Sequence, residues 1–173
     1  MFATIYLPNF YLQAALRHQQ ELVDQPVALI DDQEKKAVIV QLNAAAEEAG
    51  VRIGMTPSQG LARTLALVIK VRSVAQEKLL QNILLYFAGT LAPYVEDTAP
   101  GIATVQFTDA KNLGRKVAGA VAQLARSEIA AQAGIASTPD ASFLAAHLGK
   151  PVLEIDDTRQ FLAALPIEVL AID

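Results

Sequence analysis

The side chains that could hold a metal ion are few and widely spaced in this sequence. Glu96 and Asp97 form an acidic pair within a run of strand-forming residues. Paired carboxylates are common ligands of catalytic divalent cations. Two further acidic pairs, at positions 31–32 and 156–157, are explained better by turn and helix-cap roles.

The amino-terminal segment has the backbone pattern of a metal-binding or phosphate-binding corner, but it lacks acidic side chains. Residues 2–7 form an apolar strand that runs into Pro8 and Asn9 and then into the aromatic pair Phe10-Tyr11. Such a corner, where a strand end meets a helix start, is a favoured place for metal-binding carboxylates or phosphate-binding amides. Here the strand ends on Tyr6 and offers no acid, and core packing explains Phe10-Tyr11 better than a nucleotide platform does.

The cations are scattered, and the chain carries a net charge of −4. A protein that binds nucleic acid through its phosphates usually has a basic excess. DNA binding is therefore expected to be weak or confined to a patch. Arg52, Lys70 and Arg72 are the best candidates for phosphate contacts, against the default of a solvated surface.

The amino-acid composition further limits the kinds of binding site that the protein can have. There is no cysteine, so disulfides and thiolate metal sites are excluded. The two histidines, His18 and His147, lie on predicted helices without a second ligand nearby, which favours structural roles. The apolar share is 53% and the mean hydropathy is +0.31, yet no run reaches the roughly 18 residues of a membrane span. We expect a cytoplasmic protein, because no signal peptide precedes the first strand.

The larger predicted elements follow one another in the order β-α-β-β-α-β. They are a strand at 2–7, a helix at 75–91, strands at 94–97 and 102–107, a helix at 110–126 and a strand at 129–137. This order is that of the ferredoxin-like fold, so the fold class is α+β. Residues 1–8 and 74–173 would form this domain, and residues 9–73 would be a small α/β lobe inserted after the first strand.

The inserted lobe has clear local signals. Strands at 26–30 and 37–41 read as a hairpin or as neighbours, joined through residues 31–34. A short helix at 44–49 ends at Gly50, and Thr56 with Gln59 predicts a capping box for a helix that runs to about Leu65. A strand at 67–71 follows. Asn9, Thr138 and Asp157 are expected to cap three further helices, of which the first is expected to run to about Gln19.

The most specific stretch lies at residues 43–67, NAAAEEAGVRIGMTPSQGLARTLAL. It resembles the fingers segment of the Y-family (DinB/UmuC-like) translesion DNA polymerases, which carry Gly-Val-Arg-x-Gly-Met after a small-residue-rich helix. Three other segments occupy the places of motifs of the same family: YLPNFYLQAAL, VEDTAPGIATVQFT and AGIASTPDASFLAAHLGKP. The resemblance covers the palm and fingers, and it implies that the thumb and little-finger domains of the family are not part of this sequence. The apolar tail LPIEVLAID is similar to the junction before the thumb, so the chain is expected to be truncated there.

The resemblance implies that the functional positions have lost their chemistry. The three metal-binding carboxylates would stand at Tyr6, Gly101 and Ile102. The triphosphate-gripping Tyr and Arg of the fingers would stand at Ala44 and Glu47, and the palm lysines at Pro139 and Phe143. No catalytic residue, metal ligand or cofactor is therefore expected.

This pattern of losses resembles ImuB, a catalytically degenerate Y-family-like protein of bacterial SOS mutagenesis cassettes. The resemblance implies an adaptor in damage-induced translesion synthesis that works beside an ImuA-like protein, a DnaE-type polymerase and the sliding clamp. It also implies weak binding to primer–template DNA, with the protein located on the nucleoid during repair.

Two alternatives remain. In the first, Glu96 and Asp97 form a displaced Mg²⁺ site in an active nucleotidyltransferase. In the second, the chain is a ferredoxin-like structural or interaction module without a role on nucleic acid.

Overall fold

The computed structural model describes residues 1–31, 37–109 and 111–166. By the packing of its Cα atoms the chain divides into two compact units. The first unit comprises Met1–Pro8 and Gln81–Asp173, and the second comprises Asn9–Leu80. The predicted boundary after residue 73 precedes this division, which falls inside a helix. The expected turn at 32–34 and the tail at 167–173 lie outside the described residues.

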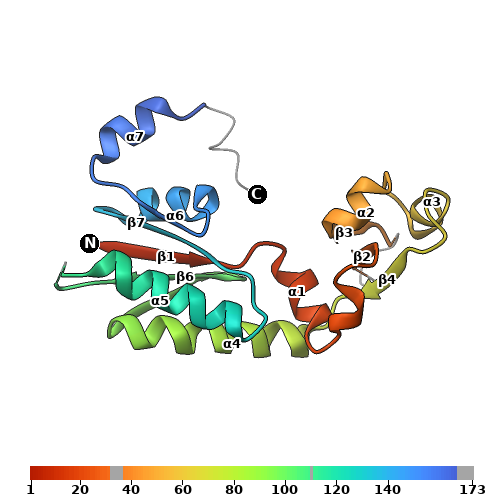
Figure 1. Cartoon of the computed structure of the whole chain (residues 1–173), viewed down its shortest axis with the longest axis horizontal. Coiled ribbons are helices and arrows are strands. Elements are labelled where there is room, and N and C mark those ends of the chain that lie inside the picture. The colour runs from red at the N-terminus through yellow and green to blue at the C-terminus, as the bar shows by residue number, and fades with distance from the viewer. Residues whose placement is uncertain (32–36, 110, 167–173) are drawn as a thin grey trace. The chain divides into compact units, whose positions relative to one another are not determined.

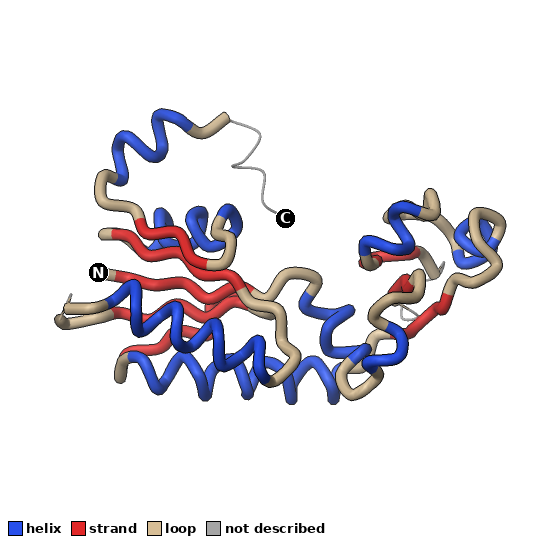
Figure 2. Tube along the Cα trace, viewed as in Figure 1, coloured by secondary structure: helices blue, strands red, loops and turns tan. Residues whose placement is uncertain are grey.

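A five-stranded mixed sheet forms the centre of the first unit (Figure 2). Its strands stand in the order β5-β6-β1-β7-β8. The first four strands of this order pair antiparallel, and β8 joins β7 in parallel. Their bounds are β1 Phe2–Tyr6, β5 Tyr94–Ala99, β6 Ile102–Gln106, β7 Gln132–Ala136 and β8 Val152–Glu154. The predicted ferredoxin-like order is confirmed, with β8 as an addition.

Helices cover both faces of this sheet. Figure 1 shows α4 and α5 along one face and α6 along the other. The bounds are α4 Val74–Leu91, α5 Leu113–Arg126, α6 Pro139–Leu148 and α7 Thr158–Ala164. Ala3, Thr4 and Ile5 on β1 are all fully buried, which explains why this strand is apolar on both faces.

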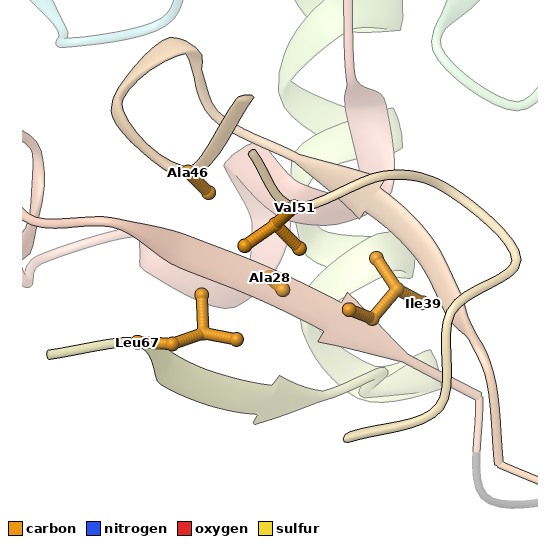
Figure 3. Close-up of a cluster of buried hydrophobic side chains, with 5 residues drawn as sticks. All are labelled: Ala28, Ile39, Ala46, Val51 and Leu67. Atoms are coloured by element: carbon orange, nitrogen blue, oxygen red, sulfur yellow. The ribbon is translucent and has the colours of Figure 1, made fainter. Parts of the chain in front are cut away.

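The second unit is built on a three-stranded sheet in the order β3-β2-β4. The predicted neighbours β2 and β3 pair antiparallel, and β4 pairs with β2 in parallel. The elements are α1 Phe10–Leu16, a 3₁₀ helix at Gln20–Leu22, β2 Val27–Ile30, β3 Ile39–Leu42, α2 Ala44–Glu48, α3 Pro57–Leu61 and β4 Val68–Val71. Five buried side chains of this unit form a core: Ala28, Ile39, Ala46, Val51 and Leu67 (Figure 3).

Most predicted helix caps are confirmed. Thr56 and Gln59 form the full capping box, and the side chains of Thr138 and Asp157 accept backbone N–H groups at the starts of α6 and α7. Asn9 is the exception: it precedes α1, but its backbone is left-handed, at φ 50°, and its side chain caps nothing. A capping side chain normally reaches the first turn from an extended backbone.

Two helices are shorter than predicted at their carboxyl ends. α3 ends at Leu61 and not near Leu65, and α1 ends at Leu16 and not near Gln19. At the start of α5, the predicted residue 110 lies outside the described part of the chain, and the described helix begins at Leu113. In the described part of the chain, no helix is long and apolar enough to cross a membrane.

Candidate functional site

The three expected metal positions meet at one end of the first unit's sheet. Tyr6 is the last residue of β1, and its register partner on β6 is Ile102. Gly101 occupies the turn before Ile102 with φ 77°, and its carbonyl oxygen accepts a hydrogen bond of 2.8 Å from the backbone N–H of Leu7. Register partners on antiparallel strands carry their side chains on the same face. A metal-binding corner is thus present in outline.

An aromatic cluster of Tyr6, Phe143 and His147 fills this corner. The ring of Tyr6 stacks on that of His147, with centroids 4.1 Å apart and planes at 25°. The ring of Phe143 lies 4.5 Å from His147 in a tilted arrangement. Burial raises the pKa of the Tyr6 phenol above its ordinary value, so the group is neutral at physiological pH. Two members of the cluster, Tyr6 and Phe143, stand at positions where the Y family would carry a carboxylate and a lysine.

A chain of hydroxyl groups anchors α6 to the sheet beside this cluster. Thr98 Oγ1 donates to Thr104 Oγ1 at 2.8 Å, and Thr104 Oγ1 lies 3.1 Å from Thr4 Oγ1. Thr4 Oγ1 in turn lies 2.8 Å from Ser142 Oγ, which donates to the carbonyl oxygen of Pro139. Thr4 and Ser142 are fully buried, so these partners satisfy groups that would otherwise be costly to bury.

The acidic pair Glu96-Asp97 is not assembled into a site. Glu96 pairs with Thr104, whose hydroxyl lies on the α6 face of the sheet. Asp97 faces the other way, where its Oδ1 accepts a hydrogen bond of 2.5 Å from Gln81 Nε2 on α4. The same Gln81 accepts the backbone N–H of Gly101 at 2.7 Å. Consecutive strand residues point to opposite faces, so the two carboxylates do not converge.

The donors of the corner do not fit a divalent cation. A neutral phenol, a glycine and an isoleucine supply none of the carboxylate oxygens that Mg²⁺ prefers. Within the ranges that the structure describes, no group of three or more histidine, cysteine, aspartate or glutamate side chains could hold a metal ion.

The expected triphosphate positions of the fingers lie on α2 in the second unit. Ala44 and Glu47 are both exposed. The Nη1 atom of Arg52 donates to the carbonyl oxygens of Glu47 and Val51, at 2.6 and 2.7 Å. Arg52 therefore stabilises the end of α2 while its guanidinium stays at the surface.

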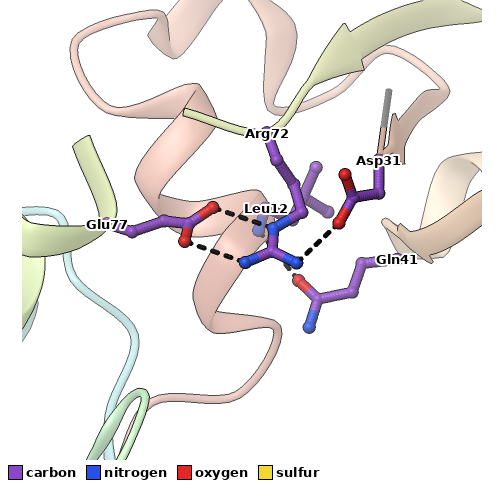
Figure 4. Close-up of polar contacts among 5 residues, drawn as sticks. All are labelled: Leu12, Asp31, Gln41, Arg72 and Glu77. Atoms are coloured by element: carbon purple, nitrogen blue, oxygen red, sulfur yellow. Dashed lines mark hydrogen bonds and ion pairs between the residues drawn. The ribbon is translucent and has the colours of Figure 1, made fainter. Parts of the chain in front are cut away.

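Arg72 is held by two carboxylates and an aromatic ring inside the second unit (Figure 4). Its guanidinium binds Asp31 at 2.8 Å and both carboxylate oxygens of Glu77 at 2.9 Å. It also lies over the ring of Tyr11, 3.9 Å from the centroid. The hydrogen bonds that Arg72 donates to Glu77 raise the pKa of Arg72 above its ordinary value. A DNA phosphate would have to compete with these partners, so the geometry gives Arg72 a structural role.

Lys70 has fewer polar contacts than Arg72. Its ammonium group donates to Gln19 Oε1 at 2.6 Å, and its side chain is half-buried. An ammonium group has three protons, so a single amide acceptor leaves room for a phosphate.

Sequence reasoning missed the stack of Tyr6 on His147 and the hydroxyl chain. Tyr6 is far from His147 in the sequence, and Thr4 is far from Thr104 and Ser142. No local sequence pattern therefore announces either set of contacts. Both depend on how α6 docks onto the sheet, which periodicity does not encode. The expected structural role of His147 is consistent with its place in the cluster.

Comparison with known proteins gives concordant matches. A model of the impB/mucB/samB family matches residues 5–147. DNA polymerase IV of Ralstonia nicotianae is 28% identical over 176 residues, covering 93% of this chain and 48% of the relative. The insertion ternary complex of Dbh DNA polymerase superposes with a TM-score of 0.84 at 15% identity, covering 97% of this chain and 53% of that structure. For DinB from Sulfolobus solfataricus the TM-score is 0.80 at 16% identity, covering 97% of this chain and 52% of that one.

The chain thus spans about half the length of these relatives. The structural matches establish the fold, and the family model covers most of the chain. The chain belongs to the impB/mucB/samB family and has the fold of the palm and fingers region of Y-family translesion DNA polymerases.

Proposed function

We propose that this chain is a non-catalytic, ImuB-like scaffold in damage-induced translesion DNA synthesis. The observation that supports it most directly is the aromatic cluster at the metal corner. Two-metal phosphoryl transfer needs carboxylates that hold both cations and activate the attacking hydroxyl. In this chain the corner holds a stacked phenol and imidazole.

The fingers support the same proposal. Glu47 stands where the family would grip the triphosphate with an arginine, and its exposed carboxylate would repel a phosphate group. A glutamate in place of an arginine reverses the local charge. Binding of an incoming nucleotide would therefore be weakened in the fingers as well as at the metal corner.

The proposed partners are those of an adaptor. A DnaE-type polymerase, an ImuA-like protein and the sliding clamp would supply catalysis and processivity, and primer–template DNA would bind weakly. Clamp binding would use the part of an ImuB-like protein beyond the palm and fingers. A scaffold of this kind acts intracellularly, at the nucleoid during repair.

An active nucleotidyltransferase with its metals at Glu96 and Asp97 is the second candidate. The acidic pair favours it, but the opposite orientations of the two carboxylates argue against it. A purely structural module would share the fold but bind neither DNA nor a polymerase.

Primer extension by the purified full-length protein tests the proposal. We expect no nucleotide incorporation with Mg²⁺ or Mn²⁺ under conditions where the Ralstonia polymerase extends the primer. Incorporation that disappears in the Glu96→Ala/Asp97→Ala variant would favour the displaced-site enzyme. A protein that neither extends primers nor binds primer–template DNA or a polymerase would support the structural module.

A further inference from the structure

The first unit has an open, apolar groove beside α5. Its volume is about 450 Å³, within the range of roughly 300–1,000 Å³ that is typical of ligand pockets. Five alanines and one valine supply most of its apolar wall: Ala118, Val121, Ala122, Ala125, Ala130 and Ala131. The groove shares no residue with the aromatic cluster.

Small side chains on one helix face create the hollow. Ala118, Ala122 and Ala125 recur at helical spacing and are exposed. The neighbouring face of α5 carries the buried Val117 and Leu124, which hold the helix on the sheet. The exposed alanines are therefore not the residues that pack α5 onto the sheet.

The groove is bordered by positive charge. Lys150 lines its other wall, at the start of the segment that leads into β8. By helical spacing, Arg115 and Arg126 flank the alanine face of α5. No acid occurs among the described residues that line the groove. Glu128, in the turn after α5, already has an interaction of its own.

This local charge contrasts with that of the whole molecule. The chain as a whole has a net charge of −4. Residues 111–126 nevertheless hold four of its 14 cations and no acid: Lys111, Arg115, Lys116 and Arg126. A basic surface on an acidic protein steers acidic partners toward one place.

We propose that this groove binds an acidic peptide segment of a partner protein. A bulky aliphatic or aromatic side chain of the segment lies against the alanines, and its carboxylates face Lys150, Arg115 and Arg126. An apolar anchor in a pocket with a polar rim is the common arrangement of protein interfaces. Nucleic acid fits less well, because its phosphates would gain nothing from an apolar wall. The inference goes beyond the proposed scaffold role and holds whether or not the chain is catalytic.

Selection from a random peptide-display library against the full chain tests this binding site. The Ala122→Glu variant serves for counter-selection, because it places a bulky acid within the groove. We expect the enriched peptides to share one large apolar residue and an excess of acids. Circular dichroism verifies that each variant is folded.

Fluorescence anisotropy with an enriched peptide then gives the affinities. Ala122→Glu should weaken binding about tenfold or more, and Lys150→Glu should also weaken it. Gln123→Glu is the matched control, since it adds the same charge to an exposed position of α5 outside the groove. It should change the affinity less than about twofold.

Several outcomes would overturn the proposal. Enrichment of basic peptides, or no enrichment at all, would exclude an acidic partner. Equal binding to Ala122→Glu and to the unmodified chain would place the peptide elsewhere. A dimer that Ala122→Glu dissociates would identify a second copy as the occupant, and DNA binding lost in Lys150→Glu but not in Ala122→Glu would identify a phosphate-binding surface.

Discussion

Tyr6 illustrates how one residue can set the chemistry of a whole corner. It pairs with Ile102 as a strand residue should, and the turn at Gly101 keeps the close approach that such a corner requires. Its ring stacks on that of His147, and its partial burial favours the uncharged phenol. The corner therefore combines regular backbone pairing with an aromatic stack in place of charged side chains.

Arg72 shows the converse, since a predicted surface cation proves to be an internal one. Its side chain is 28% exposed, and the Glu77 side chain is 11% exposed. Sequence alone could not distinguish it from Arg52 or Lys70, because its acidic partners come from separate segments of the second unit.

We predict that Arg72→Met destabilises the chain by about 2 kcal/mol, because it leaves Glu77 and Asp31 partly buried without their cation. Urea unfolding followed by circular dichroism measures this change. Lys78→Met, at an exposed position of α4, is the control and should have an effect below about 0.5 kcal/mol. Equal stabilities for the two variants would show that the ion pairs of Arg72 contribute nothing.

At the scale of elements, β7 and α6 approach each other closely at Gly134. A side chain at Gly134 would place its Cβ 2.3 Å from both the backbone nitrogen of Ala146 and the carbonyl oxygen of Ser142. The absence of a side chain at Gly134 lets α6 lie close enough for Ser142 to reach Thr4.

Gly134→Ala should therefore cost about 3 kcal/mol or more, because rigid backbone atoms would have to move. Gly119→Ala is a matched control on α5, where a Cβ meets nothing within 4 Å. It should stabilise the chain by about 0.5–1 kcal/mol, as expected for glycine replaced in a helix. Thermal unfolding separates the two cases, and a similar midpoint for both would disprove the close packing of α6.

The elements that could be predicted are those that short-range sequence patterns determine. The capping box at Thr56 and Gln59 depends on a spacing of three residues, and the order of strands and helices along the first unit follows from local patterns. Both predictions are confirmed. The strand β8, only three residues long, was not predicted. The cap that Asn43 forms on α2 was also missed, and it was detectable, since Asn precedes the helix directly.

The candidate site was predictable only in part. The resemblance to the Y family indicated which positions to compare, and the structure brings Tyr6, Gly101 and Ile102 together. The resemblance could not indicate which side chains fill the corner, because the ring that stacks on Tyr6 comes from α6. The orientations of Glu96 and Asp97 required the register of β5 on β6.

For the whole molecule, charge limits what the chain can do with DNA. We expect weak binding to primer–template DNA, with a slope of log K against log salt of about −2 to −3, as for two or three phosphate contacts. Arg52→Ala/Lys70→Ala should reduce the magnitude of this slope by about 2. Fluorescence anisotropy over a salt series measures it.

Arg159→Ala is the control for this titration, since Arg159 is an exposed cation on α7. It should leave the slope unchanged. If the double variant and the control gave the same slope, the phosphate contacts would lie elsewhere on the molecule.

The hydroxyl chain has one more consequence, because each hydroxyl has a single proton to donate. When Ser142 donates its proton to the carbonyl oxygen of Pro139, Thr4 must donate to Ser142 and Thr104 to Thr4. In this arrangement the O–H bonds point from the sheet edge toward α6. Loss of Ser142 would then strand a buried donor on Thr4, whereas loss of Thr98 would free only a lone pair on Thr104. Substitution should therefore be tolerated less well at Ser142 than at Thr98.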